Sequence, residues 1–214
     1  MIVYQDSEIV VCIKKRGLIS QEAVSGTQSM VSLLREECAC QIYPVHRLDK
    51  EVGGLMVYAK TKESAGVLSK QVSDRTMKKC YLAVTQGLLA APEGKMEDLL
   101  FFDKSKNKSF VVKRERKGVK KAVLNYRLIA ALEDKALYFV CLETGRTHQI
   151  RVQFASRGLP LLGDKKYGSK ISSHIGLYSC KLTFNHPKTK KEMTFTSMPN
   201  EGAFQWFNDM ELSF

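Results

Sequence analysis

The sequence lacks any apolar run that approaches the roughly 20 residues needed by a membrane-spanning helix. Its first residues, 1–6, also lack the basic start and long apolar stretch of a signal peptide. We therefore expect a soluble, cytoplasmic protein without a membrane partner. A Gly-rich nucleotide-binding loop and the Gly-x-Ser-x-Gly elbow of serine hydrolases are missing as well, so no cofactor is expected.

Cysteine is sparse and scattered along the chain. The 214 residues include 6 cysteines, and only Cys38 and Cys40 lie close together in the sequence. This spacing differs from the dense framework of a small disulfide-rich secreted domain, so we expect reduced, buried thiols. No second Cys or His pair stands at zinc-finger spacing, and no metal site is expected.

Acidic residues are outnumbered by basic ones. The chain has 34 Lys and Arg against 22 Asp and Glu, a formal charge of +12. Such an excess favours an anionic partner, and nucleic acid is the usual one because Lys and Arg release the counterions condensed on phosphates. Two basic stretches, residues 104–108 and 113–121, are predicted to form loops beside the sheet, either as solvated hairpin tips or as RNA contacts.

The order of hydrophobic patterns predicts an α+β fold with a large, mainly antiparallel, mixed sheet flanked by helices. With 44% hydrophobic residues and no linker, the chain is expected to form one domain over residues 1–214. The expected strands are two within residues 1–14 around an Asp6-Ser7 turn, then 53–60, 80–84, 109–113, 122–132, 136–142, 181–185 and 192–196. The expected helices are 27–38, 62–72 with Thr61 as N-cap, 147–157 closed by Gly158, and 201–209.

Two polar segments are candidates for chemistry. The first, His46-Arg47-Leu48-Asp49, lies in a predicted loop just before the strand at 53–60, where it forms either a solvated ion pair or a catalytic cluster. The second, Gly145-Arg146-Thr147-His148-Gln149-Ile150-Arg151, begins a predicted helix, whose free N–H groups suit a phosphate. A capped, solvated helix start is the alternative for this second segment.

Together the two segments resemble the signatures of the RluA-type RNA pseudouridine synthases, a His-Arg-Leu-Asp motif followed by a Gly-Arg-Thr/Ser-His-Gln-Ile/Leu-Arg motif. The likeness continues through residues 79–84, 162–168 and 182–189, and so covers nearly the whole chain. The resemblance implies the pseudouridine synthase fold with a catalytic cleft. It also implies an enzyme that isomerises uridines in ribosomal or transfer RNA, with RNA as its partner and no cofactor.

The resemblance also implies roles for individual residues. Asp49 would be the nucleophile, Tyr81 would lie against the target base, and Arg151 would form a salt bridge with Asp49. Arg47 would occupy the space left by the extruded base. The further candidates for RNA contact are His46, Arg146, His148 and Gln149, and for the two histidines the alternative is orienting neighbours. Asp164 and His186 are expected to shape turns.

The sequence departs from the family pattern at two places. Val52 stands where the family commonly has threonine, which removes a hydroxyl close to Asp49 in sequence. Ile13-Lys14-Lys15 stands where Asn-Lys-Pro is common, and we expect the basic run that begins at Lys14 to add RNA-facing charge.

Two other functions remain possible from sequence alone. One is a non-catalytic RNA-binding protein that retains the fold, and the other is a hydrolase that uses Asp49 with His46. We expect a monomer whose choice of RNA site rests on the catalytic domain itself, because no separate N-terminal RNA-binding domain precedes it in this sequence.

Overall fold

The computed structural model describes residues 1–22 and 28–207, and the chain divides into two compact units. Unit 1 comprises Met1–Lys79 and Tyr178–Met198, and unit 2 comprises Cys80–Leu177 together with the described part of Pro199–Phe214. The expectation of one domain over the whole chain stays a prediction.

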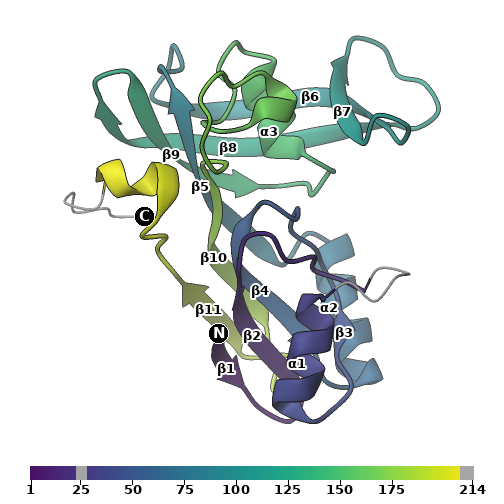
Figure 1. Ribbon diagram of the computed structural model, residues 1–214. Coiled ribbons are helices and arrows are strands. Elements are labelled where there is room, and N and C mark those ends of the chain that lie inside the picture. Colours follow the sequence, from purple (N-terminus) through teal and green to yellow (C-terminus); the bar gives the residue numbers. More distant parts are fainter. Residues whose placement is uncertain (23–27, 208–214) are drawn as a thin grey trace. The chain divides into compact units, whose positions relative to one another are not determined.

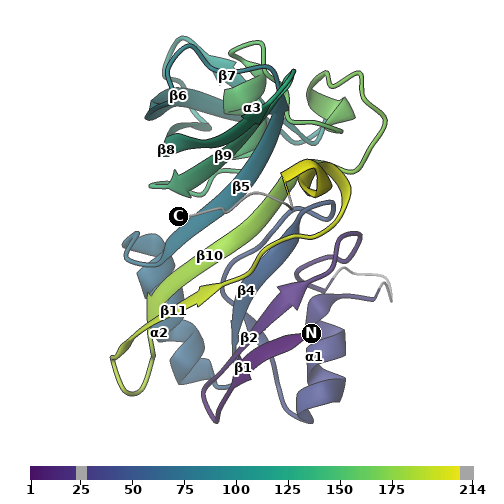
Figure 2. The ribbon, with the colours of Figure 1, turned by 90° about the vertical axis from the view of Figure 1, so that its left-hand side faces the viewer.

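Unit 1 is a sheet with helices α1 (Met30–Cys38) and α2 (Lys62–Ser73) on opposite sides (Figures 1 and 2). The strand β4 (Gly53–Ala59) pairs antiparallel with β2 and β3 and parallel with β10, so the sheet is mixed. The remaining strands of this unit are β1 (Ile2–Gln5), β2 (Ile9–Lys14), β3 (Tyr43–Pro44), β10 (Leu177–Asn185) and β11 (Glu192–Thr196).

Alternating apolar residues explain why unit 1 folds in this way. Ile9 and Val11 of β2 and Leu55 and Val57 of β4 share one face of the sheet and pack with Leu68 of α2. The side chain of the predicted N-cap, Thr61, accepts a hydrogen bond from the Ser64 backbone N–H. The helix predicted at 27–38 is confirmed from Met30 onward, and position 27 lies outside the described residues.

Gly54 is required where β4 meets β10. Its φ of +119° is strained for an L side chain, and a Cβ atom there would lie 2.3 Å from the backbone oxygen of Ser179. The two backbones therefore approach closely only because this position is glycine. The contact positions the start of β4 at Gly53, which is four residues after Asp49, the last residue of the His46–Asp49 motif.

Unit 2 contains a sheet with the strand order β5, β9, β8, β6, β7. The pairs β9–β8, β8–β6 and β6–β7 are antiparallel. The strands are β5 (Lys78–Gln86), β6 (Glu93–Asp103), β7 (Lys108–Val112), β8 (Val119–Leu132) and β9 (Lys135–Leu142). Helix α3 (Gln149–Ala155) lies over this sheet near β6 and β8 (Figure 1). Its buried Phe154 packs against Tyr126 of β8 and Tyr138 of β9.

The α+β class with a mainly antiparallel mixed sheet is confirmed, but three local predictions need correction. Strand β6 was not predicted, and the segment at 147–157 forms a seven-residue helix that begins only at Gln149. His148 adopts a left-handed φ of 54°, so Arg146 lies in a loop and not on a helical turn. Near the C-terminus Gly202–Phe207 forms a 3-10 helix, and positions 208–209 of the predicted helix lie outside the described residues.

The prediction of six reduced thiols is wrong for two of them. Cys80 of β5 and Cys141 of β9 form a disulfide with their Cα atoms 4.1 Å apart. The two cysteines are 61 positions apart in sequence, and only the pairing of β5 with β9 brings them together. The other four cysteines, Cys12, Cys38, Cys40 and Cys180, remain as thiols.

We expect a thiol titration to distinguish these two groups. Under denaturing conditions without a reductant, alkylation should label the four free cysteines and leave Cys80 and Cys141 unlabelled. After reduction all 6 cysteines should react. Peptide mass spectrometry identifies the cross-linked pair, and label on Cys141 before reduction would contradict the disulfide.

Candidate active-site residues

The His46–Asp49 motif lies in a loop of unit 1 that several hydrogen bonds hold in place. Ser20 clamps Leu48, because its hydroxyl donates to the Leu48 carbonyl at 2.9 Å and accepts from the Leu48 N–H at 3.0 Å. The Val52 N–H donates to the Asp49 carbonyl at 3.0 Å and closes a turn. Val52 is itself buried, so this turn is held through the backbone without the hydroxyl that threonine would supply.

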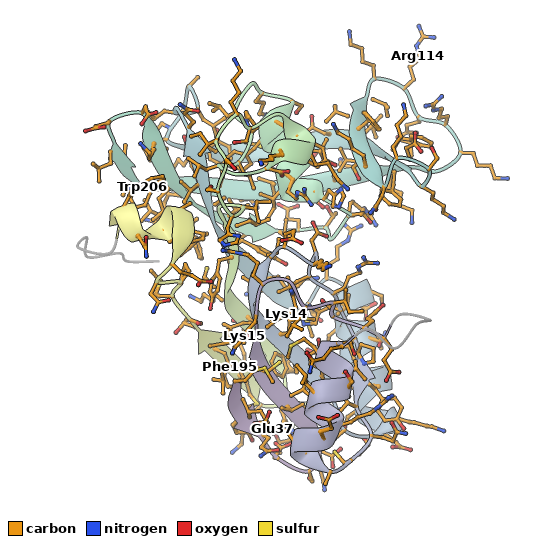
Figure 3. All side chains as sticks on the ribbon, in the orientation of Figure 1. Lys14, Lys15, Glu37, Arg114, Phe195 and Trp206 are labelled. Atoms are coloured by element: carbon orange, nitrogen blue, oxygen red, sulfur yellow. A yellow bond between two sulfur atoms is a disulfide. The ribbon has the colours of Figure 1, made fainter. Side chains whose placement is uncertain are left out.

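Lys14 is a second anchor of the same loop. It is fully buried, and its Nζ donates to the carbonyls of Leu18 at 2.7 Å, Lys15 at 3.1 Å and Lys50 at 3.1 Å. Burial lowers the pKa of Lys14 to about 8, while the nearby carboxylates Glu51 and Asp49 favour its charged form. The expectation that Lys14 faces RNA is therefore wrong, and its ammonium group instead ties β2 to the residue after Asp49. Figure 3 labels Lys14, the last residue of β2, and Lys15, which follows it.

His46 is buried behind the loop with only 8% of its surface exposed. Its Nε2 accepts a hydrogen bond from the Val57 N–H at 3.1 Å, which places the proton of the neutral ring on Nδ1. Burial, with a smaller contribution from Lys79, lowers the pKa of His46 to about 3. This contact joins the loop to the middle of β4, as expected of a residue that orients its neighbours.

The neutral state of His46 predicts a loss of stability in acid. Between pH 6.5 and about 3 the unfolded chain protonates this ring whereas the folded protein does not, so the free energy of unfolding decreases as the pH falls. We expect this residue to contribute a loss of about 2 kcal/mol between pH 7 and pH 4.5. Denaturant unfolding of a His46→Gln variant should show a shallower pH dependence. The matched control His174→Gln, at an exposed histidine, should follow the native protein, and equal slopes for the two variants would contradict the assignment.

Tyr81 lies in β5 of unit 2 and is 6% exposed. The residue before it, Cys80, is joined to Cys141, so the backbone next to the phenol is fixed covalently to β9. A tyrosine in such a strand is usually part of the sheet core. Its predicted role against a target base therefore stays a prediction.

Arg151 of α3 is held by a carboxylate that sequence reasoning had assigned only to a turn. Its Nε and Nη2 donate to the two carboxylate oxygens of Asp164 at 2.7 and 2.8 Å, and the two side chains are 9% and 1% exposed. Such a bidentate pair fixes the plane of the guanidinium. Tyr167 packs against the same group, with its ring centre 5.2 Å from the Arg151 Cζ. The predicted salt bridge from Arg151 to Asp49 stays a prediction.

Gln149 organises the loop that precedes α3. Its Oε1 accepts from the Thr144 hydroxyl at 2.8 Å and from the Arg146 N–H at 3.0 Å, and its Nε2 donates to the Val123 carbonyl at 3.1 Å. Only 3% of the side chain is exposed, which leaves its amide little surface for RNA. His148 is similarly enclosed, with Nδ1 at 3.0 Å from the Tyr167 hydroxyl.

The remaining RNA-contact candidates have more accessible side chains. Arg47 is exposed, and Arg146 is half-buried with its Nε donating to the Lys121 carbonyl at 2.9 Å.

The helices in the described part of the chain are too short or too polar to span a membrane. In the same part of the chain, His, Cys, Asp and Glu side chains do not gather into a group that could hold a metal ion.

A carboxylate on a loop held by hydrogen bonds, an arginine oriented by Asp164 and an excess of basic residues suit chemistry on nucleic acid. The RNA pseudouridylate synthase family model matches residues 8–156, so the chain belongs to this family. It is 32% identical to the RNA pseudouridine synthase YlyB of Bacillus subtilis and 30% identical to the ribosomal large subunit pseudouridine synthase D of Zymomonas mobilis. Each alignment covers 94% of this chain, and the chain spans 70% and 69% of those two relatives.

A third relative has nearly the same length as this chain. The tRNA pseudouridine synthase C of Pasteurella multocida is 28% identical over 97% of this chain and 93% of its own. Among solved structures, the human RNA pseudouridylate synthase domain containing 4 superposes with a TM-score of 0.76 at 24% identity. That superposition covers 92% of this chain and 87% of the human one, and it shows the shared fold.

Proposed function

We propose that this chain isomerises specific uridines in ribosomal or transfer RNA to pseudouridine, with Asp49 as the nucleophile. The observation that carries the proposal is the anchored loop around Asp49 in a member of the pseudouridylate synthase family. Ser20 and Lys14 bond the backbone of this loop at Leu48 and Lys50, and His46, within the loop, bonds Val57 of β4. A carboxylate that must meet one carbon atom gains from such fixed positioning.

The reaction breaks the C1′–N1 glycosidic bond, turns the base and forms a C1′–C5 bond. The proton at C5 is lost and one is gained at N1, so atoms and electrons balance without a cofactor. Asp49 attacks C1′ or removes a sugar proton to give a glycal, and either route uses an ionised carboxylate. In this proposal Arg151 pairs with Asp49 and keeps it charged, while Asp164 sets the plane of the Arg151 guanidinium.

The target uridine must leave its base stack before Asp49 can reach it, which costs a few kcal/mol. Arg47 is exposed on the loop and would fill the gap, and Tyr81 would pack on the extruded ring. The exposed basic residues between β7 and β8 would bind phosphates, and Figure 3 shows Arg114 extending from this loop away from the sheet. His46 would act by holding the loop around Asp49, and Gln149 by holding the loop that precedes α3; neither would touch RNA.

The proposal is tested with purified protein in the presence of a chelator. Unmodified ribosomal and transfer RNA transcripts are incubated with the protein, digested to nucleosides and analysed by chromatography with mass detection. Isomerisation gives a nucleoside of unchanged mass with the retention time of pseudouridine. Release of free uracil would instead identify a hydrolase, and RNA that binds but is never modified would identify a non-catalytic RNA-binding protein.

We also propose that the protein acts as a monomer in the cytoplasm.

A further inference from the structure

A hollow of about 700 Å³ lies within unit 2, between the hairpin of β6 and β7 and the loop that precedes α3. Its volume falls in the range of about 300–1,000 Å³ that is typical of small-ligand sites. We call it the hairpin groove. The lining residues used below are Phe102, Asp103, Lys104, Lys120 and Arg146.

The hairpin groove combines an aromatic wall with a cationic rim. Phe102 is half-buried and is held edge-on by His148 with 6.3 Å between ring centres. Lys104 and Lys120 are exposed, and Arg146 is fixed by its bond to the Lys121 carbonyl. An aromatic surface beside several cations matches a flat base attached to a phosphate.

The acidic residue that lines the hairpin groove, Asp103, is engaged in its own turn. One of its oxygens accepts from the Ser105 N–H at 2.9 Å, the Ser105 hydroxyl at 2.6 Å and the Lys106 N–H at 3.2 Å. These bonds lower the pKa of Asp103, so its carboxylate stays ionised and is held in the turn. The three cations of the rim, Lys104, Lys120 and Arg146, outnumber this one negative charge.

The two faces of the hairpin differ. Phe101 and its cross-strand neighbour Phe110 lie on the face opposite Phe102, where the Arg116 guanidinium lies 4.9 Å from the centre of the Phe101 ring and the ammonium of Lys108 lies 5.7 Å from that of Phe110. Cations therefore already cover the rings of that face. Phe102, paired with Ser109, lies on the side of the loop that precedes α3.

We propose that the hairpin groove binds one unpaired nucleotide of the substrate RNA, separate from the target uridine. Its base stacks on Phe102, and its phosphates contact Lys120 and Arg146. A paired base in a duplex cannot enter a hollow of this kind, so the site favours a loop or another single-stranded segment. The inference rests on the proposed function only in naming RNA as the partner.

The test measures binding of a fluorescent single-stranded RNA oligonucleotide by anisotropy, with every variant made in Asp49→Asn protein so that no turnover occurs. The matched pair is Phe102→Leu and Phe101→Leu. These residues are consecutive in β6 and both half-buried, but their side chains point to opposite faces of the sheet, and of the two only Phe102 lies on the face of the loop that precedes α3. We expect Phe102→Leu to weaken binding about tenfold, the effect of one lost stacking contact, and Phe101→Leu to leave it unchanged. Equal affinities for the two variants would overturn the proposal.

A second pair separates the groove from general charge. Lys117 precedes β8 and Lys120 is the second residue of β8; both are exposed, and of the two Lys120 lines the hairpin groove. Removing one base from the oligonucleotide should weaken its binding to the native protein. This loss of affinity should be smaller in the Lys120→Gln protein and unchanged in the Lys117→Gln protein. An abasic strand that binds native protein as tightly as the intact RNA would overturn the proposal, and so would AMP that binds as tightly as the oligonucleotide. Because the readout is binding, these outcomes are independent of whether the protein makes pseudouridine.

Discussion

Replacing Asp49 with asparagine is expected to abolish pseudouridine formation. Asparagine has nearly the same shape and keeps the backbone bond from Val52 to position 49, but it supplies no carboxylate to attack C1′ or to take a proton. We expect the single-turnover rate to decrease about 10,000-fold or more, the scale on which removal of a nucleophile acts. Thermal unfolding should change little, because Ser20 and Lys14 bond the backbone of the loop on both sides of position 49.

Glu51 provides the matched control for this experiment. It is an exposed carboxylate two residues away in the same turn and contributes a similar charge near Lys14. Glu51→Gln should retain nearly native turnover, while RNA affinity should be similar in both variants. The measurement is tritium release from RNA labelled at C5 of uridine under single-turnover conditions. Native turnover in the Asp49→Asn protein would refute the role of Asp49 and with it the proposed mechanism.

Local patterns were sufficient to predict most elements of the fold. The strands β2 and β4, the Thr61 cap of α2 and the bounds of β11 follow from neighbouring residues and are confirmed. Strand β6 was not predicted because its sequence, EGKMEDLLFFD, has charged residues through its first half. Its pairing with β8 over nine residue pairs supplies what its own composition lacks.

The contacts that hold the site could not be predicted in the same way. Lysine is almost always exposed, and Lys14 is buried only because three carbonyls, one of them 36 positions away, converge on its ammonium. The disulfide between Cys80 and Cys141 and the pair between Arg151 and Asp164 also join residues that are distant in sequence. Motifs can therefore identify the reactive side chains, whereas the groups that position them emerge only from the tertiary structure.

The second large effect is expected from Asp164, which positions Arg151. Asp164→Ala leaves a buried guanidinium without its bidentate partner, and losing one member of a buried pair costs about 3–5 kcal/mol of unfolding free energy. The position has little room for rearrangement, since Gly163 just before it has φ of +75° and a Cβ there would lie 2.3 Å from the His174 carbonyl oxygen. Denaturant unfolding measures this loss. The control Glu97→Gln breaks the exposed pair with Lys121 in the same unit and should cost less than about 1 kcal/mol.

A double variant separates the stabilising role of this pair from its role in catalysis. Arg151→Met with Asp164→Leu removes both charges together, so no buried ion remains unpaired and much of the lost stability should return. Turnover should not return, because in our proposal the Arg151 guanidinium keeps Asp49 ionised and oriented. If the double variant regains both stability and turnover, the pair serves only the fold of unit 2. If turnover stays lost in a stable protein that still binds RNA, Arg151 acts in the reaction and Asp164 acts by holding it in position.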